Sequence, residues 1–186
     1  KSVGDMVKIT NPKLFVHIGR CSKQKNQRVL LEAFNKFRLK HPDSFLLIFG
    51  GGFDSKRGLF LKKIAGSGIF FMGTTKNIID YLILSNSFLL SSSFEGMPIS
   101  LIEALACGCV PISTPTSGAI DVLQNGINGY ITEGFSSDDF YKTLSAFPIN
   151  NSEKLSLNSI KTYNMKFSIE KCSNEYLRLY KIKKEV

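Results

Sequence analysis

The stretch SFLLSSSFEGMPISLIEALACGCVPIST, residues 87–114, decides the fold. Its apolar segments at 87–92 and 109–114 are short and continuous, which indicates two buried strands. Residues 98–108 between them have proline in the first turn and glycine after the end, the usual asymmetry of helix termini. A strand, a helix and a strand in this order predict two parallel strands joined by a helical crossover.

The same alternation of apolar strands and helical segments continues on both sides of this stretch. Strands that are apolar on both faces indicate a parallel sheet covered by helices on each side. We therefore expect an α/β fold, a Rossmann-like doubly wound parallel sheet of about six strands, with its ligands beyond the carboxyl ends of the strands. The other elements are expected as strands at 13–19, 44–52, 68–73 and 129–132, and as helices at 26–41, 55–66, 76–85 (with Thr74 or Thr75 as N-cap), 118–126, 137–147, 151–163 and 168–184.

Length and composition favour one domain. The 186 residues are 43% hydrophobic, which suits a single sizeable core. No apolar run reaches the roughly 18 residues of a membrane span. The N-terminal KSVGDMVKIT has neither the apolar segment of a signal peptide nor an initiator methionine, which fits a fragment of a longer protein. Four cysteines without C-x-x-C spacing predict reduced thiols in the cytoplasm: Cys21, Cys107, Cys109 and Cys172.

The charge balance favours anionic partners. The formal net charge is +9, with modest clusters at SKQKNQR (22–28) and KIKK (181–184). Such clusters are also explained by a solvated face. No zinc-finger spacing or aromatic RNA-binding motif accompanies them, so we do not expect a nucleic-acid partner. The basic excess adds a weaker expectation of peripheral contact with anionic lipid at the inner membrane face.

Glu103 lies inside the apolar helix expected at 98–108. A helix that is apolar nearly all round is usually buried. A buried carboxylate is costly unless it is paired or hydrogen-bonded. Two interpretations are open: a protein partner such as a cap or a buried arginine, or hydroxyl groups of a ligand.

Glu95 precedes GMPIS (96–100), which leads into the same helix. The free amides and the dipole of a helix N-terminus suit a phosphate, and Gly96 allows close approach. Glu95 either favours this dipole or faces an uncharged polar group such as a sugar. A nucleotide sugar satisfies all these features. Glu95 would then hold the sugar, Glu103 the ribose, and the loop and first turn the phosphates, through Gly96, Met97, Ile99 and Ser100.

These residues carry a resemblance. FEGMPISLIEALACGCVPIST (94–114) resembles the E-x7-E signature of the retaining glycosyltransferases of family 4, also called group 1. FVHIGRCSKQKNQ (15–27) is similar to the first strand of the C-terminal, donor-binding half of that family, and IFFMGTTKNIIDYL (69–82) to the strand and loop that meet the base. The resemblance implies that Gly19, Arg20 and Lys25 bind the donor diphosphate and that Thr75 lies at the base.

The family has a GT-B architecture of two Rossmann-like domains. The resemblance implies that this chain is the C-terminal half, with a core at 13–165 and a crossover helix at 166–186, and that the N-terminal, acceptor-binding domain is missing. GAIDVLQNGINGYI (118–131) resembles a glycine-containing region of the family, with two departures. Ser117 replaces a common glycine, and Asp121 replaces a common glutamate, so Asp121 is not counted as a site residue.

The implied reaction is transfer of a hexose, with retention, from a nucleoside diphosphate sugar, a UDP-sugar foremost. The acceptor would be a glycan or a lipid-linked sugar in polysaccharide biosynthesis. Arg20, Lys25 and Glu95 are the expected catalytic residues. Because these cations and the helix terminus can neutralise the leaving group and no D-x-D motif occurs, no metal or other cofactor is expected. His17, in mid-strand, is expected in the core.

Two alternatives stay open. The chain on its own could be a non-catalytic nucleotide-sugar binding module, and it is expected to be inactive without its other half. It could also belong to a sugar-nucleotide epimerase of the same architecture. The pairing of E-x7-E with G-R-x4-K argues against the epimerase.

Overall fold

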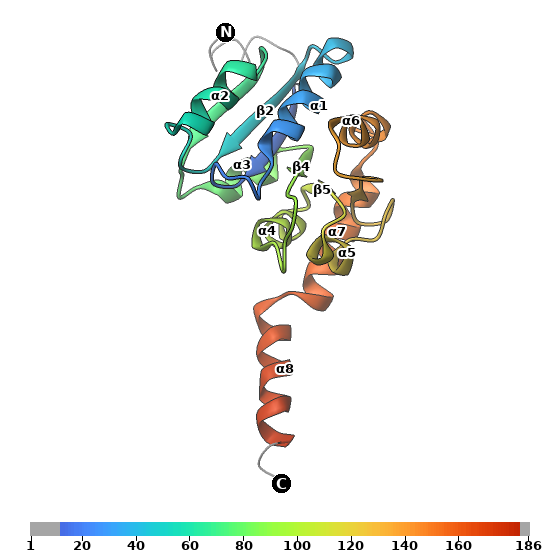
Figure 1. Cartoon of the computed structure of the whole chain (residues 1–186). Coiled ribbons are helices and arrows are strands. Elements are labelled where there is room, and N and C mark those ends of the chain that lie inside the picture. Colours follow the sequence, from blue (N-terminus) through green and yellow to red (C-terminus); the bar gives the residue numbers. More distant parts are fainter. Residues whose placement is uncertain (1–11, 183–186) are drawn as a thin grey trace.

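A six-stranded parallel sheet forms the centre of the molecule (Figure 1). The computed structural model describes residues 12–182. Every neighbouring pair of strands is parallel, in the order β3-β2-β1-β4-β5-β6. This is the strand order of Rossmann domains, so the predicted fold class is confirmed. The strands are β1 (Lys13–Ile18), β2 (Ser44–Phe49), β3 (Ile69–Gly73), β4 (Ser87–Leu90), β5 (Val110–Ser113) and β6 (Tyr130–Ile131).

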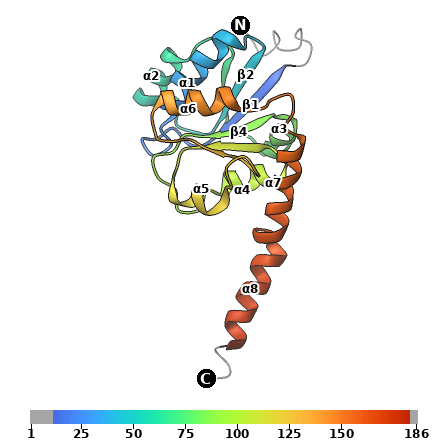
Figure 2. The ribbon, with the colours of Figure 1, turned by 90° about the vertical axis from the view of Figure 1, so that its right-hand side faces the viewer.

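Helices cover both faces of the sheet, as the apolar strands require (Figure 2). One face carries α1, α2 and α6, and the other carries α3, α4 and α5. Each strand contributes alternate side chains to the two cores, such as Phe15 to the first and Val16 to the second. The helices are α1 (Gln27–Lys40), α2 (Lys56–Ile64), α3 (Ile78–Leu84), α4 (Ile99–Ala106), α5 (Ser117–Val122), α6 (Ser137–Ala146), α7 (Glu153–Lys166) and α8 (Ile169–Ile182).

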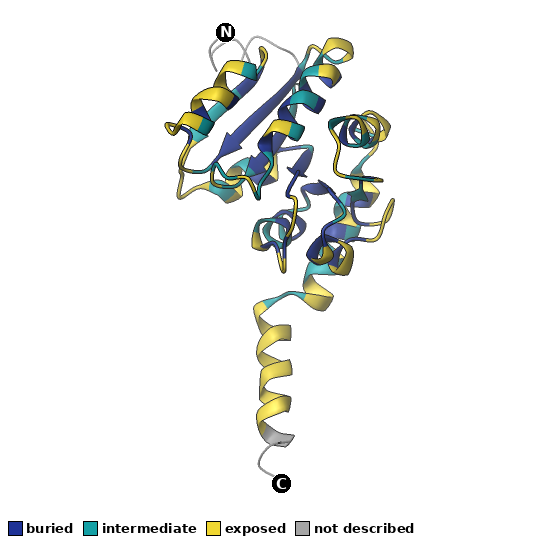
Figure 3. Ribbon diagram, viewed as in Figure 1, coloured by how far each residue is buried: buried dark blue, intermediate teal, exposed yellow. Residues whose placement is uncertain are grey.

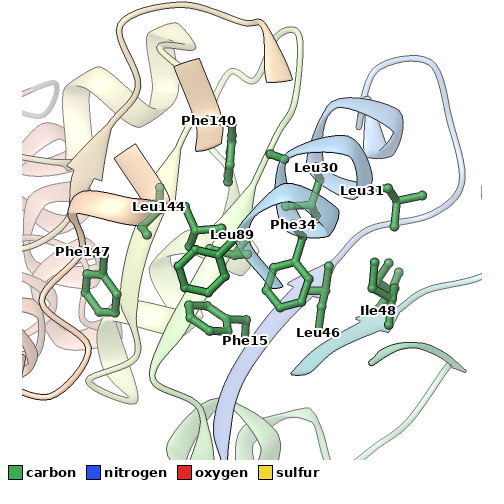
Figure 4. Packing of buried hydrophobic residues seen from close by; sticks show 14 of the residues in the cluster. Phe15, Leu30, Leu31, Phe34, Leu46, Ile48, Leu89, Phe140, Leu144 and Phe147 are labelled. Atoms are coloured by element: carbon green, nitrogen blue, oxygen red, sulfur yellow. The ribbon is translucent and has the colours of Figure 1, made fainter. Parts of the chain in front are cut away.

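An aromatic cluster fixes α1 on β1 (Figure 4). The ring of Phe15 meets the rings of Phe34 and Phe37 edge-on, with centroids 5.4 and 5.5 Å apart, and all three are fully buried. Truncating one buried phenylalanine to alanine costs about 3–5 kcal/mol of stability. The loop between β1 and α1 is therefore anchored at both ends by the same cluster.

Several predicted boundaries were wrong by a few residues, and two of them bear on the site. The strand expected at 44–52 ends at Phe49, because Gly50 turns with φ 141° and a Cβ there would stand 2.3 Å from the carbonyl oxygen of Gly19. The helix expected at 76–85 begins at Ile78, and its N-cap residue is Asn77, not a threonine. Thr75 instead accepts a hydrogen bond from the Asn77 amide at 3.1 Å, within the turn before the helix.

The last helix, α8, extends away from the sheet (Figures 1 and 3). Residues 169–180 are all exposed, including Ile169 and Tyr176. The helix falls where one was expected, while the last two lysines of KIKK lie outside the described residues. Between residues 12 and 182, no helix is both long and apolar enough to cross a bilayer.

Candidate functional site

The candidate site lies between β1 and β4, where the chain switches from adding strands at one side of β1 to adding them at the other side. β1 and β4 are neighbours, but the chain leaves β1 toward α1 on one face and β4 toward α4 on the other. Such a reversal opens a crevice at the carboxyl ends of the strands, where α/β proteins bind ligands. The loops 19–26 and 91–98 meet at this position.

An ion pair joins these loops. The Nζ atom of Lys25 lies 2.6 Å from Oε1 of Glu95, and the Ser92 hydroxyl donates to the same oxygen at 2.6 Å. The side chains are only 17% and 9% exposed. From the sequence, Lys25 was predicted to bind a diphosphate, by family resemblance, and Glu95 to bind a sugar. The two side chains were not predicted to contact each other. The structure brings them together, so Lys25 offsets the negative charge of Glu95.

The main chain of Glu95 is held from a third element, α5. Its carbonyl oxygen accepts hydrogen bonds from the Ser117 hydroxyl at 3.0 Å and from the Gly118 amide at 3.1 Å. A Cβ on Gly118 would stand 2.0 Å from the carbonyl oxygen of Gly96, so only glycine fits at this approach. Ser117, a departure from the family pattern, therefore contributes a hydrogen bond that glycine could not.

Arg20 lies on the loop that follows β1, with its side chain exposed. In the part of the chain that the structure describes, its guanidinium has no hydrogen-bond or ion-pair partner. Its carbonyl oxygen accepts a hydrogen bond from Nε2 of Gln27 at 2.8 Å, and Gln27 is fully buried. A Cβ on Gly19 would stand 3.1 Å from the Lys25 alkyl chain and 3.2 Å from Nε2 of His17, so Gly19 lets Lys25 lie close to the loop.

The N-terminus of α4 lies directly after the loop 91–98 and is not capped by a side chain. Its N-cap residue is Pro98, which has no side-chain capping bond. Gly96, Met97 and Ile99 are exposed and Ser100 is half-buried. Among the described loops, no hydrogen bond engages the amides of these four residues. The arrangement offers free N–H groups and the positive end of a helix dipole.

Glu103 is less buried than the sequence predicted. The helix is not buried all round, because Leu101, Ala104 and Leu105 face the core while Glu103 is half-buried. Between residues 12 and 182 it forms no hydrogen bond or ion pair, so the expected cap or buried arginine is not found there. Partial burial raises the pKa of the Glu103 carboxyl. A half-buried acceptor without a protein partner remains free for a ligand.

Other predicted residues fall as follows. Thr75 is exposed beyond β3, at the carboxyl edge of the sheet but two strands from β1.

His17 is fully buried, as expected, and its Nδ1 donates to the Leu89 carbonyl at 2.8 Å. Burial lowers the pKa of His17 to about 4, so the ring is neutral at pH 7. Within residues 12–182, no cluster of three or more His, Cys, Asp or Glu side chains could hold a metal ion.

The sequence did not single out Gln24 and Gln27. Both lie in the SKQKNQR cluster, where the lysines and arginine suggested a solvated face. The sequence feature that could have identified them is the pair of glutamines on either side of Lys25. Their amide side chains are long enough to reach neighbouring main-chain groups.

Comparison with known proteins identifies the family. The model described as "Glycosyl transferases group 1" matches residues 5–162. MJ1059 of Methanocaldococcus jannaschii, an uncharacterized glycosyltransferase, is 30% identical over 158 residues, which are 76% of this chain and 39% of that protein. The N,N'-diacetylbacillosaminyl-diphospho-undecaprenol alpha-1,3-N-acetylgalactosaminyltransferase of Campylobacter jejuni is 26% identical over 145 residues, 76% of this chain and 38% of that one.

A solved structure agrees with the fold. Anabaena Alr3699/HepE in complex with UDP and glucose superposes with a TM-score of 0.81 at 16% identity, covering 97% of this chain and 53% of that one. At this identity the likeness shows the fold alone, a Rossmann-like domain. The chain spans about two fifths of the length of the curated relatives it matches, 39% for each of the first two. By its family match, the chain belongs to the group 1 glycosyltransferases.

Proposed function

We propose that this chain is the donor-binding domain of a retaining glycosyltransferase that transfers a hexose from a nucleoside diphosphate sugar, a UDP-sugar foremost. The observation that carries the proposal is the site at the carboxyl ends of β1 and β4. There, a free guanidinium, an ion pair and an uncapped helix terminus lie on adjoining loops. The UDP and glucose in the Anabaena structure support the choice of donor.

Arg20, Lys25 and the N-terminus of α4 act on the diphosphate in this proposal. Negative charge builds up on the leaving diphosphate as the sugar departs, and its stabilisation by preorganised donors is the main demand on the site. Arg20 is exposed and unpaired in the described structure, so it can contact phosphate without breaking an existing bond. The amides of Gly96, Met97, Ile99 and Ser100 add neutral donors. A site of this kind needs no metal ion.

The two glutamates bind hydroxyl groups in this proposal. Oε1 of Glu95 already accepts from Lys25 and Ser92, whereas Oε2 has only a long contact at 3.5 Å. Oε2 is therefore the atom that accepts a hydrogen bond from a sugar hydroxyl. Glu103, half-buried without a protein partner, accepts from the ribose, and Thr75 lies at the base.

The acceptor and the rest of the enzyme are also part of the proposal. The curated relatives are longer than this chain, which supports a further, N-terminal domain that binds the acceptor. The name of the Campylobacter relative contains a diphospho-undecaprenol, which favours a glycan or lipid-linked acceptor. The formal charge of +9 fits work in the cytoplasm at the inner face of a membrane with anionic lipid.

Two experiments test the proposal. Titration calorimetry of the 186-residue chain with UDP, GDP and ADP should show binding, with UDP strongest. Product analysis of the full-length protein with UDP-sugars then separates transferase from epimerase and from a non-catalytic module. An epimerised nucleotide sugar without transfer, or no turnover with any acceptor, contradicts the proposal. A product of opposite anomeric configuration contradicts retention only.

A further inference from the structure

Gln24 ties the two loops of the site together with both its main chain and its side chain. Its carbonyl oxygen accepts the Ser93 amide at 2.7 Å, and its Nε2 donates to the Phe94 carbonyl at 3.1 Å. Both contacts fall on the two residues directly before Glu95. The same Nε2 lies 3.5 Å from Oε2 of Glu95.

The contacts of Gln24 and Lys25 divide the carboxylate of Glu95 between its two oxygens. Lys25 and Ser92 engage Oε1 at 2.6 Å each, which orients the carboxylate plane. Gln24 faces the other oxygen at a distance too long for a strong hydrogen bond. The partial positive charge of its amide therefore attracts Oε2 without saturating its lone pairs.

The residue type at 24 suits this arrangement. An amide donates two hydrogens and carries no net charge. A carboxylate here would repel Glu95 and the Phe94 carbonyl, and an ammonium would compete with Lys25 for the same partner. Gln24 is half-buried, so its contacts compete less with solvent than a free surface amide would.

We propose that Gln24 is a positioning residue for sugar recognition: by holding residues 93–94 and facing Oε2, it aims the free oxygen of Glu95 at a hydroxyl of the donor hexose. The inference rests on the proposed function, since it requires that Glu95 bind the sugar. It separates two roles within one loop, because Arg20 acts on the diphosphate, whereas Gln24 acts only on the hexose, through Glu95.

The test compares UDP with UDP-glucose, UDP-galactose and UDP-N-acetylglucosamine, by titration calorimetry of the 186-residue chain. Gln24→Met keeps the length of the side chain and removes its donors. We expect it to weaken binding of the preferred UDP-sugar about three- to tenfold, the range of one ordinary hydrogen bond, and UDP by less than about twofold. In a Glu95→Ala background, Gln24→Met should have no further effect on the ratio of the two dissociation constants.

Gln124→Met is the matched control, because the Gln124 side chain is exposed and forms no described hydrogen bond, while its main chain alone contacts Ile127 and Asn128. It should leave both dissociation constants unchanged. Equal weakening of UDP and UDP-sugar by Gln24→Met, or no change in either, overturns the inference. If neither UDP nor any UDP-sugar binds the wild-type chain, the proposed function fails and the inference with it. If UDP-sugars bind but Glu95→Ala leaves their affinity intact, the assigned role of Glu95 fails while donor binding stands.

Discussion

Lys25 and Glu95 are 70 residues apart in the chain, yet their charged atoms meet at 2.6 Å between β1 and β4. The pair is almost closed to solvent, with exposed fractions of 17% and 9%. Removing one member of a buried ion pair leaves an uncompensated charge, which costs more than the pair contributes as a whole.

Lys25→Met should therefore lower the free energy of unfolding by about 3 kcal/mol, because Glu95 keeps its charge without its partner. Urea denaturation with the m-value held constant measures this loss. The double variant Lys25→Met/Glu95→Gln should recover much of the stability while still failing to bind UDP-sugar. As a surface control, Arg28→Met breaks the exposed Arg28–Glu32 pair and should change stability by less than about 1 kcal/mol.

Arg20→Ala should weaken UDP binding at least tenfold, since a charge-assisted hydrogen bond contributes about 1.5–3 kcal/mol. Its stability should stay that of the wild type, because the exposed guanidinium has no partner among the described residues. Calorimetry with UDP and a thermal melt measure the two quantities. Lys56→Ala, at an exposed position in the first turn of α2, is the control and should leave UDP affinity unchanged. Normal UDP affinity in Arg20→Ala would remove Arg20 from the diphosphate site.

Glu103 should make the stability of the folded chain depend on pH, and the sign of this dependence follows from the burial of its carboxyl group. Desolvation raises the pKa of this carboxyl in the folded chain, so folding favours the protonated form. Its ionisation therefore lowers stability as pH rises from its unfolded pKa through its folded pKa. Glu103→Gln removes this effect and should not lower the melting temperature at pH 7.

The affinity for a nucleotide should change with pH in the direction opposite to that of the stability, again because of Glu103. In the proposed function the ribose hydroxyls donate to the Glu103 carboxylate, so UDP affinity of the wild type should fall as pH decreases through the raised pKa of Glu103. Glu103→Gln should bind UDP more weakly at pH 7 and should lack this part of the pH dependence. Calorimetry of both chains over one pH series isolates the residue, because all other titrating groups are shared. A large stability loss with normal UDP affinity would instead indicate a structural role.

The 186-residue chain should bind a nucleoside diphosphate yet transfer almost no sugar. In the proposed function the described site residues all address a donor, and holding both reactants in line is worth about 7–11 kcal/mol of the barrier. Incubation with labelled UDP-sugars and candidate acceptors is the measurement. Multiple turnovers by this chain alone would show that the acceptor site lies on it.

The order of elements and most of the candidate site could be predicted from sequence. Apolar runs such as 44–49 are buried whatever surrounds them, and glycine and proline mark where helices end. Glu95 and Glu103 stood out by their own surroundings, whereas Arg20 and Lys25 were implied by the resemblance to the group 1 family. Apolar runs and helix-end residues are local patterns. The types of the residues in the stretch are themselves the cause of the burial or of the helix end.

Which groups touch was decided by the tertiary structure alone. The Lys25–Glu95 pair depends on β1 and β4 being neighbours, and the contacts of Gln24 with residues 93–94 depend on the same strand order. The half-burial of Glu103 depends on which face of α4 packs on the sheet. Strand order and helix orientation follow from closing the whole core, a long-range condition that no short stretch of sequence contains.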